Sequence, residues 1–123
     1  MTIEQAINRA DAIKPNQYDE KLKIAWLSEI DNTVNNTIIR MAEISKDHEF
    51  TGYNEGTEPD TQLLVEDPYS EMYIPYLHSK MDLYNQDYER YNSSVAAYYT
   101  GLQNYATYYN RTNKPIEHVI KVF

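Results

Sequence analysis

The chain contains no cysteine, and only three of its 123 residues are glycine. The lack of cysteine excludes disulfides, thiolate metal sites and a cysteine nucleophile. With so few glycines, and with neither GxGxxG nor GxxxxGK[ST] present, we expect no backbone cradle for phosphate groups. Basic residues are also scarce, because eleven lysines and arginines stand against nineteen acidic residues, for a net charge of −8. This balance disfavours sequence-independent binding to nucleic acid and docking on anionic membranes.

Long apolar runs are missing too, since no stretch approaches the roughly 18 consecutive apolar residues of a transmembrane helix. The first residues, Met1 to Gln5, include a glutamate and lack the apolar core of a signal peptide. The lack of cysteine is consistent with an intracellular protein. The sequence therefore predicts a protein that does not engage a membrane.

Local patterns of catalytic or ligand-binding residues are absent from the sequence. His48, His78 and His118 have no second metal ligand at helical spacing, and there is no HExxH motif. No GxSxG turn marks a nucleophile, and the glutamates of the expected helices form no ExxE pair that would hold magnesium. We expect no catalytic, cofactor-binding or metal-binding residues, and no enzyme activity.

Tyrosine is the residue that the chain has in excess, with thirteen tyrosines against two phenylalanines and one tryptophan. The ring of tyrosine is apolar while its hydroxyl group needs water or a partner, which suits surfaces that are wet in the free protein and buried in a complex. The length and the 41 % share of hydrophobic residues predict one folded domain over residues 1–123, and the periodic patterns described next predict that it is mainly α-helical.

Two helices are predicted in the first half of the chain. Thr2 and Gln5 form a capping-box pattern at the start of a helix over about residues 2–13. A second helix is expected over about residues 18–45, where apolar residues recur at spacings of three and four. Its apolar stripe consists of Ile24, Leu27, Ile30, Val34, Ile38, Met41 and Ile44.

The two stretches that flank the second half of the chain lack helical patterns. Residues 46–67 carry two of the three glycines and seven acidic residues, which predicts a loop with a short strand over Thr61–Val65. Residues 111–123 leave the helical pattern at Pro115 and end in a run rich in apolar residues, which suits a short β element at the C-terminus. Such a strand would need Thr61–Val65 or another subunit as its partner.

Residues 69–110 carry the longest pattern in the chain. Apolar residues and tyrosines alternate at spacings of three and four over five heptads, which predicts one long helix that packs on a partner segment. The residues of this seam are Ile74, Leu77, Met81, Tyr84, Tyr88, Tyr91, Val95, Tyr98, Leu102, Tyr105 and Tyr109. Because Asn92, Ser93 and Ser94 are suited to capping a new helix, a helical hairpin that turns at residues 92–94 is the alternative.

Six tyrosines of the seam are the predicted interaction residues: Tyr84, Tyr88, Tyr91, Tyr98, Tyr105 and Tyr109. The pattern leaves open whether these rings form a core or a subunit interface. Other tyrosines of this stretch lie off the seam and place rings on more than one helix face, which favours assembly. We assign Trp26, Leu27 and Ile30 to the core that packs against the seam.

Several distinctive blocks are spread over nearly the whole chain: residues 3–7, 14–16, 26–31, 52–53, 59–64, 68–69, 87–92 and 108–111. Together they resemble small proteins encoded in the structural-gene modules of tailed phages and prophages of Gram-positive bacteria. That group is similar to head–tail connector (adaptor) proteins, which are small helical subunits that form a ring beneath the portal and join the head to the tail. The resemblance implies a viral protein that is not an enzyme and has no cofactor.

The resemblance also implies partners and a location. The partners would be further copies of the chain, as a homo-oligomer that takes the form of a ring, and portal or tail-side proteins of the phage. The protein would be found in the bacterial cytoplasm during assembly, and in the virion if the phage is functional. The alternative hypothesis is a helical adaptor or regulatory protein that binds one protein partner through its tyrosine-rich face. An enzyme that uses a metal held by the acidic loop is a third hypothesis, which the mismatch of this loop with calcium-binding loops disfavours.

Overall fold

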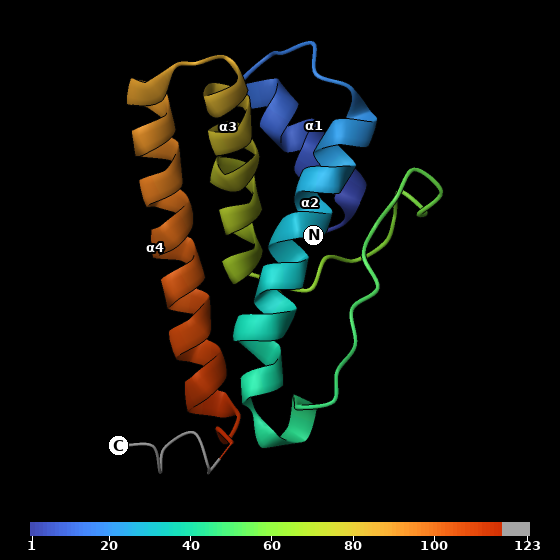
Figure 1. Ribbon diagram of the computed structural model, residues 1–123, viewed down its shortest axis with the longest axis vertical. Helices are drawn as coiled ribbons and strands as arrows, with labels where there is room; N and C mark the ends of the chain where they lie inside the picture. Colours follow the sequence, from blue (N-terminus) through green and yellow to red (C-terminus); the bar gives the residue numbers. More distant parts are fainter. Residues whose placement is uncertain (117–123) are drawn as a thin grey trace.

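The computed structural model describes residues 1–116 and is mainly helical, which confirms the predicted fold class (Figure 1). In this part of the chain the α-helices are α1 (Ile3–Ile13), α2 (Glu20–Thr37), α3 (Tyr73–Tyr84) and α4 (Tyr88–Thr112). Short 3-10 turns follow α2 and precede α3: η1 (Ile39–Met41), η2 (Glu43–Ser45) and η3 (Tyr69–Met72).

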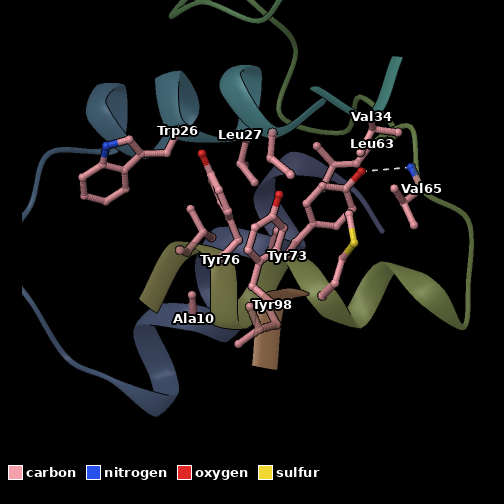
Figure 2. Close-up of a cluster of buried hydrophobic side chains, with 14 of the residues drawn as sticks. Ala10, Trp26, Leu27, Val34, Leu63, Val65, Tyr73, Tyr76 and Tyr98 are labelled. Carbon is pink, nitrogen blue, oxygen red and sulfur yellow. Dashed lines mark hydrogen bonds between the residues drawn. The ribbon is translucent and has the colours of Figure 1, made fainter. Parts of the chain in front are cut away.

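Helix α3 lies between the other helices, with α1 and α2 packed against it on one side and α4 on the other (Figure 1). The core is formed where α2 faces α3, with Leu27 and Val34 opposite Tyr73 (Figure 2). Trp26, Leu27 and Ile30 are at most 1 % exposed, so their predicted place in the core is confirmed.

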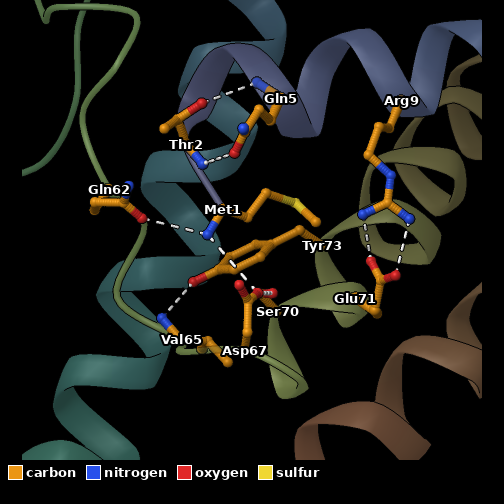
Figure 3. Close-up of polar contacts among 10 residues, drawn as sticks. All are labelled: Met1, Thr2, Gln5, Arg9, Gln62, Val65, Asp67, Ser70, Glu71 and Tyr73. Carbon is orange, nitrogen blue, oxygen red and sulfur yellow. Dashed lines mark hydrogen bonds and ion pairs between the residues drawn. The ribbon is translucent and has the colours of Figure 1, made fainter.

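The predicted capping box of α1 is present (Figure 3). The amide of Gln5 donates to the Thr2 hydroxyl at 3.1 Å, and the amide of Thr2 donates to the Gln5 side chain at 2.9 Å. These two bonds satisfy backbone donors that a helix start leaves free. Helix α1 then buries its apolar stripe, which consists of Ile3, Ala6, Ile7 and Ala10.

Helix α2 is shorter than the predicted range of 18–45. Asp19 caps its start by accepting from the amide of Lys21 at 3.1 Å, and the helix ends at Thr37. The side chain of Asn35 bonds to His48 instead of facing solvent, and Ile44, at the end of the predicted stripe, is 83 % exposed. The helix therefore ends where asparagine and threonine, which are weak helix formers, replace the apolar pattern.

The predicted loop over residues 46–67 is present and extends to Pro68, but Thr61–Val65 is not a strand. A single antiparallel bridge joins Gln62 to Thr2, and the side chains of the loop residues Leu63 and Val65 are buried. The loop thus pairs with the start of the chain. In the tail, Pro115 forms one antiparallel bridge with Ala42, and residues 117–123 of the predicted C-terminal β element lie outside the described residues.

The prediction of one continuous helix over 69–110 is wrong, and the stretch forms the alternative helical hairpin. The hairpin turns at residues 85–87, and not at the predicted 92–94. Gln86 adopts a positive φ of 59°, and Asp87 caps α4 by accepting from the amide of Arg90 at 3.2 Å. Ser94 remains inside α4 because its hydroxyl group has a partner across the hairpin, the carboxylate of Asp82, at 2.7 Å.

Two further features shape the hairpin. Pro75 lies in the first turn of α3, where its missing amide hydrogen leaves no helix bond unmade. Gly101 allows α4 to approach η3, because a Cβ atom at this position would lie 2.7 Å from the Cβ atom of Met72. The glycine is therefore a close packing point, not a break in the helix.

Candidate interaction surface

The six predicted interaction tyrosines divide into a buried, an exposed and a half-buried pair. Tyr98 and Tyr105 are 7 % and 2 % exposed, and they are the only buried residues of α4. Tyr84 and Tyr88, next to the hairpin turn, are 55 % and 60 % exposed. Tyr91 and Tyr109 are half-buried. Tyr84 lies before the turn at residues 85–87 and the other five tyrosines lie after it, although all six follow one spacing pattern in the sequence.

The buried tyrosines of α4 pack against α3 and η3. The ring of Tyr98 meets that of Tyr76 in α3 edge to face, with 4.9 Å between centroids. Tyr105 lies against Tyr69, at 5.9 Å. Burial, and to a lesser degree the neighbouring Tyr99, raises the pKa of Tyr98 to about 12. Of the two readings that the sequence left open, core or subunit interface, the burial of Tyr98 and Tyr105 places both rings in the core of the chain.

Tyr109 also serves the fold. Its hydroxyl oxygen lies 2.6 Å from that of Ser45, and the Ser45 hydroxyl is 2.6 Å from the carbonyl oxygen of Ile39. These contacts link the end of α4 to the turns that follow α2. Tyr109 is thus engaged within the chain, although its ring is only half-buried.

A surface groove runs between α3 and α4 near the hairpin turn, with a volume of about 330 Å³. Three helices line the groove. Helix α4 contributes Tyr91, Tyr98 and Tyr99, α3 contributes Tyr76, Lys80 and Leu83, and α2 contributes Thr33. We call this the tyrosine groove. Tyr99 and Leu83 are 60 % and 38 % exposed, so the groove offers large apolar side chains to a partner.

Among the described residues that line the tyrosine groove, Lys80 is the one that is charged. Lys80 forms an ion pair with Glu29 at 3.1 Å, and its amino group lies 5.6 Å from the centroid of the Tyr76 ring. The Tyr76 hydroxyl donates to Glu29 at 3.3 Å. These polar groups are satisfied within the chain, so a partner would meet mainly ring faces and aliphatic groups.

Tyr84 belongs to a separate aromatic cluster. Its ring meets Trp26 at 5.4 Å and Tyr18 at 6.1 Å, both edge to face. The hydroxyl of Tyr18 donates to the side chain of Asn85 in the hairpin turn. The cluster therefore holds the turn against α2, and more than half of Tyr84 remains accessible.

Asp31 is a buried acid that the sequence analysis did not single out. It is 0 % exposed, and its carboxylate accepts from the Tyr53 and Tyr73 hydroxyls, both at 2.5 Å. The amide of Leu64 donates to it at 3.0 Å. Burial raises the pKa of Asp31, and the hydrogen bonds from the two tyrosines and the Leu64 amide offset part of the rise.

The role of Asp31 is to hold the long loop on the helices. Tyr53 and Leu64 belong to the loop, whereas Tyr73 belongs to α3 and accepts in turn from the amide of Val65 at 2.9 Å (Figures 2 and 3). A spacing signal marks Asp31, because it follows Leu27 by four residues and precedes Val34 by three. An acid on the apolar stripe of a helix points inward and needs buried partners.

Two ion pairs, each with one buried partner, join the helices to one another. Asp82 is 1 % exposed and forms an ion pair with Lys14, and its other carboxylate oxygen accepts from Ser94. Lys23 is 4 % exposed and pairs with Asp11 at 2.9 Å. Since their partners are all within the chain, these charged groups act in folding.

Within residues 1–116, no group of three or more histidine and acidic side chains is arranged to hold a metal ion. None of the helices in the described part of the chain is both long and apolar enough to span a membrane.

The sequence was compared with models of protein families and with curated proteins, and the fold with solved structures, and none of them matches.

Proposed function

We propose that this protein is a non-catalytic structural subunit of a tailed phage or prophage, of the head–tail connector type, which acts by self-association and by docking on portal or tail-side proteins. The observation that carries the proposal is the tyrosine groove. In this groove Tyr99 is 60 % exposed and Tyr91 is half-buried, although the chain buries Tyr76 and Tyr98 beside them. Tyrosine is enriched at protein interfaces because it combines a large apolar area with a polar end.

The buried acids support a structural role over a catalytic one. Asp31 and Asp82 are at most 1 % exposed, and both carboxylates are engaged by donors of the same chain. A general acid or base must lie within hydrogen-bond reach of its substrate. Acids that are enclosed in this way stabilise the fold, and the accessible tyrosines remain as the groups for recognition.

The sequence resemblance supplies the virion context. Connector subunits work by occupying a fixed place in a ring, so their surfaces must bind copies of themselves and other virion proteins. The net charge of −8 suits this setting, since an acidic surface beside a DNA channel repels phosphate groups and lets DNA slide.

Two measurements test the proposal together. The mass of the purified protein in solution is expected to exceed the 14.5 kDa of one chain, and the protein is expected in purified phage particles. A chain that remains at 14.5 kDa at high concentration and is missing from the particles would overturn the proposal.

The groove also fits the second candidate, an adaptor for one protein partner. Its volume of about 330 Å³ accommodates a few side chains of a partner helix. In that case the protein would form a discrete one-to-one complex with a different protein. Substitution of Tyr99 by serine would then weaken this complex without changing the mass of the isolated protein.

A further inference from the structure

The large apolar side chains that remain exposed gather at the two ends of the molecule. Seven such side chains are exposed in residues 1–116, and of these only Tyr99, in the tyrosine groove, lies between the ends. One end contains the hairpin turn and the loop that joins α1 to α2, and the other contains η1, η2 and the last turn of α4 (Figure 1). Exposed apolar groups that gather in this way mark sites of interaction.

The end with the hairpin turn combines apolar groups with acids, and we call it the acidic end. Its exposed apolar residues are Ile13, Leu83, Tyr84 and Tyr88. The segments that carry them are held together because Lys14 pairs with Asp82 and the hydroxyl of Tyr18 donates to Asn85. Three acids of this end are exposed and form no ion pair within residues 1–116: Asp19, Glu20 and Glu89.

The opposite end combines apolar groups with bases, and we call it the basic end. Its exposed apolar residues are Met41 and Ile44, and Ile44 is the most exposed large apolar side chain in residues 1–116. Backbone hydrogen bonds hold the segment after α4 beside these turns. The amide of Glu43 donates to the carbonyl oxygen of Lys114 at 2.8 Å, and the amide of Ile116 donates to that of Met41 at 2.9 Å.

The basic end also holds the bases that the described fold leaves without an acid. Seven of the ten lysines and arginines in residues 1–116 form ion pairs within the chain. The other three are Arg40, Arg111 and Lys114, all of which are exposed at this end. On a protein with a net charge of −8, this end is therefore the surface that complements an acidic partner with apolar groups of its own.

We propose that copies of this chain associate head to tail, with the basic end of one copy docked on the acidic end of the next. Met41 and Ile44 then pack on the exposed apolar side chains of the neighbour, and the bases around them face its acids. Helix α4 reaches from one end to the other, so each copy engages a neighbour at both ends of this helix (Figure 1). The proposal rests on the self-association proposed above and names the two surfaces that carry it.

The charges at the two ends select this polarity. Two acidic ends would repel each other, and so would two basic ends, which disfavours a two-fold pair of either kind. The two ends of one copy lie at opposite extremes of its long axis, so they meet only between copies (Figure 1). Contact between unlike ends gives every copy the same direction, as a ring of like-oriented subunits requires.

The size of the contact predicts weak association of two isolated copies. The ends offer few exposed apolar side chains, which places the contact at the small end of specific interfaces. Closure of a ring holds each copy at two contacts and stabilises the assembly beyond a single contact. Association of the purified protein is therefore expected to depend on its concentration and to weaken as the ionic strength rises.

Cysteine cross-linking tests the geometry, because the chain has no cysteine of its own and both chosen side chains are exposed. Chains with Ile13→Cys mixed with chains with Ile44→Cys are expected to form a covalent dimer with a short bis-maleimide linker, whereas neither variant links to itself. Chains that carry both substitutions are expected to give a ladder of covalent oligomers. Asn8→Cys, on the exposed side of α1, is the control and should not link to Ile44→Cys.

Charge reversal at the acidic end tests the complementarity by sedimentation velocity. Glu20→Lys with Glu89→Lys is expected to weaken association about tenfold or more, because both ends of the chain are then basic. The matched control is Glu58→Lys with Asp60→Lys in the long loop, which makes the same change in net charge at exposed positions away from the ends. The control should associate at least as well as the wild type, because it carries less excess negative charge.

Charge reversal at the basic end completes the test. Arg111→Glu with Lys114→Glu is expected to weaken association to a similar degree, because both ends are then acidic. An equimolar mixture of the two reversed chains is expected to associate again, since each reversed end then meets an end of opposite charge. Circular dichroism of each variant confirms that the helices are retained.

The outcomes separate the two proposals. A wild-type protein that remains monomeric at high concentration and gives no cross-link would overturn self-association and, with it, the head-to-tail contact. Oligomers that form normally while the reversed chains associate like the wild type, and Ile13→Cys fails to link to Ile44→Cys, would overturn the head-to-tail contact alone. Efficient linking of Ile44→Cys to its own copy would contradict the polarity.

Discussion

The two helices of the hairpin differ in how much of each the fold encloses. Helix α3 buries seven of its 12 residues, whereas α4 buries two of 25. The reason is position, since α3 has α1 and α2 on one side and α4 on the other, while α4, within residues 1–116, packs on α3 and η3 (Figure 1). Helix α4 is about twice as long as α3, and most of its surface remains exposed within the described part of the chain.

The composition of the helices follows this difference. The buried residues of α3 include Leu77 and Met81 together with the ion-paired Asp82. The exposed positions of α4 between residues 91 and 110 carry serine, alanine, threonine, asparagine, glutamine and one tyrosine, without a charge. We infer that α3 stabilises the fold and that α4 serves assembly.

The largest effect is expected for Leu77→Ala in α3. Leu77 is 0 % exposed, so the substitution leaves a cavity and should lower the free energy of unfolding by about 2–5 kcal/mol. The matched control is Leu102→Ala in α4, where the side chain is half-buried in the groove and less than half of this loss is expected. Chemical denaturation of both variants measures the difference, and equal losses would mean that α4 is held as firmly as α3.

A second contrast lies between the two faces of α4. Gly101→Ala is expected to cost about 1–3 kcal/mol, although alanine is the better helix former, because the new Cβ atom meets Met72 at 2.7 Å. Ala96→Gly on the exposed face is expected to cost only about 0.5–1 kcal/mol, from helix propensity alone. Thermal unfolding distinguishes the two, and a stabilising Gly101→Ala would show that α4 does not approach η3 as closely as described.

Asp31→Asn tests the link between the long loop and the helices. An amide nitrogen cannot accept a hydrogen bond, so one tyrosine hydroxyl loses its acceptor, at a cost of about 1–3 kcal/mol. Because the pKa of Asp31 in the folded protein lies above that of an unfolded chain, about 3.9, protonation favours the folded state. Its contribution is fully present below the unfolded pKa and is lost as the pH rises through the folded pKa.

The pH dependence of unfolding measures this contribution. The free energy of unfolding of the wild type, minus that of Asp31→Asn, is expected to increase as the pH falls from 7 toward 4. Glu71 serves as a contrast, since its hydrogen bond with Arg9 lowers its pKa, and Glu71→Gln should change the slope in the opposite direction (Figure 3). A difference that decreases toward acid would contradict the buried environment of Asp31.

The smallest effect on stability is expected for Tyr99→Ser. Tyr99 is 60 % exposed, so the free energy of unfolding at low protein concentration should change by less than about 0.5 kcal/mol. The neighbouring Tyr98→Ser should cost about 3 kcal/mol or more, because Tyr98 is 7 % exposed and packs on Tyr76. If Tyr99→Ser unfolded the protein to a similar degree, the outer side of α4 would be part of the core.

The sequence predicted the helical class and the local features, because these depend on residues close together in the chain. The capping box of Thr2 and Gln5 and the buried place of Trp26 are examples. The turn of the hairpin was misplaced, since Tyr84 and Tyr88 keep the same spacing across it and Asn92 to Ser94 resemble cap residues equally well. What holds Ser94 in the helix is Asp82, a contact that arises only once the hairpin has formed.

The candidate site could be predicted only in part, for a related reason. The periodic seam included Tyr91 and Tyr98, which line the groove, together with Tyr105, which is buried elsewhere. Periodicity identifies a helix face, but the neighbour that covers that face is decided by tertiary packing. Tyr99 lies off the seam and is the most exposed ring of the groove.

Hydrogen exchange at two protein concentrations tests the central claim, that α4 is the helix that serves assembly. Helix α4 buries few residues, so its amides are expected to exchange through local opening, and association along α4 should slow that opening. The account predicts that amides of residues 91–110 exchange more slowly at high concentration, while those of α3 change little. Exchange of α4 that is independent of concentration, or that slows only in parallel with α3, would contradict it.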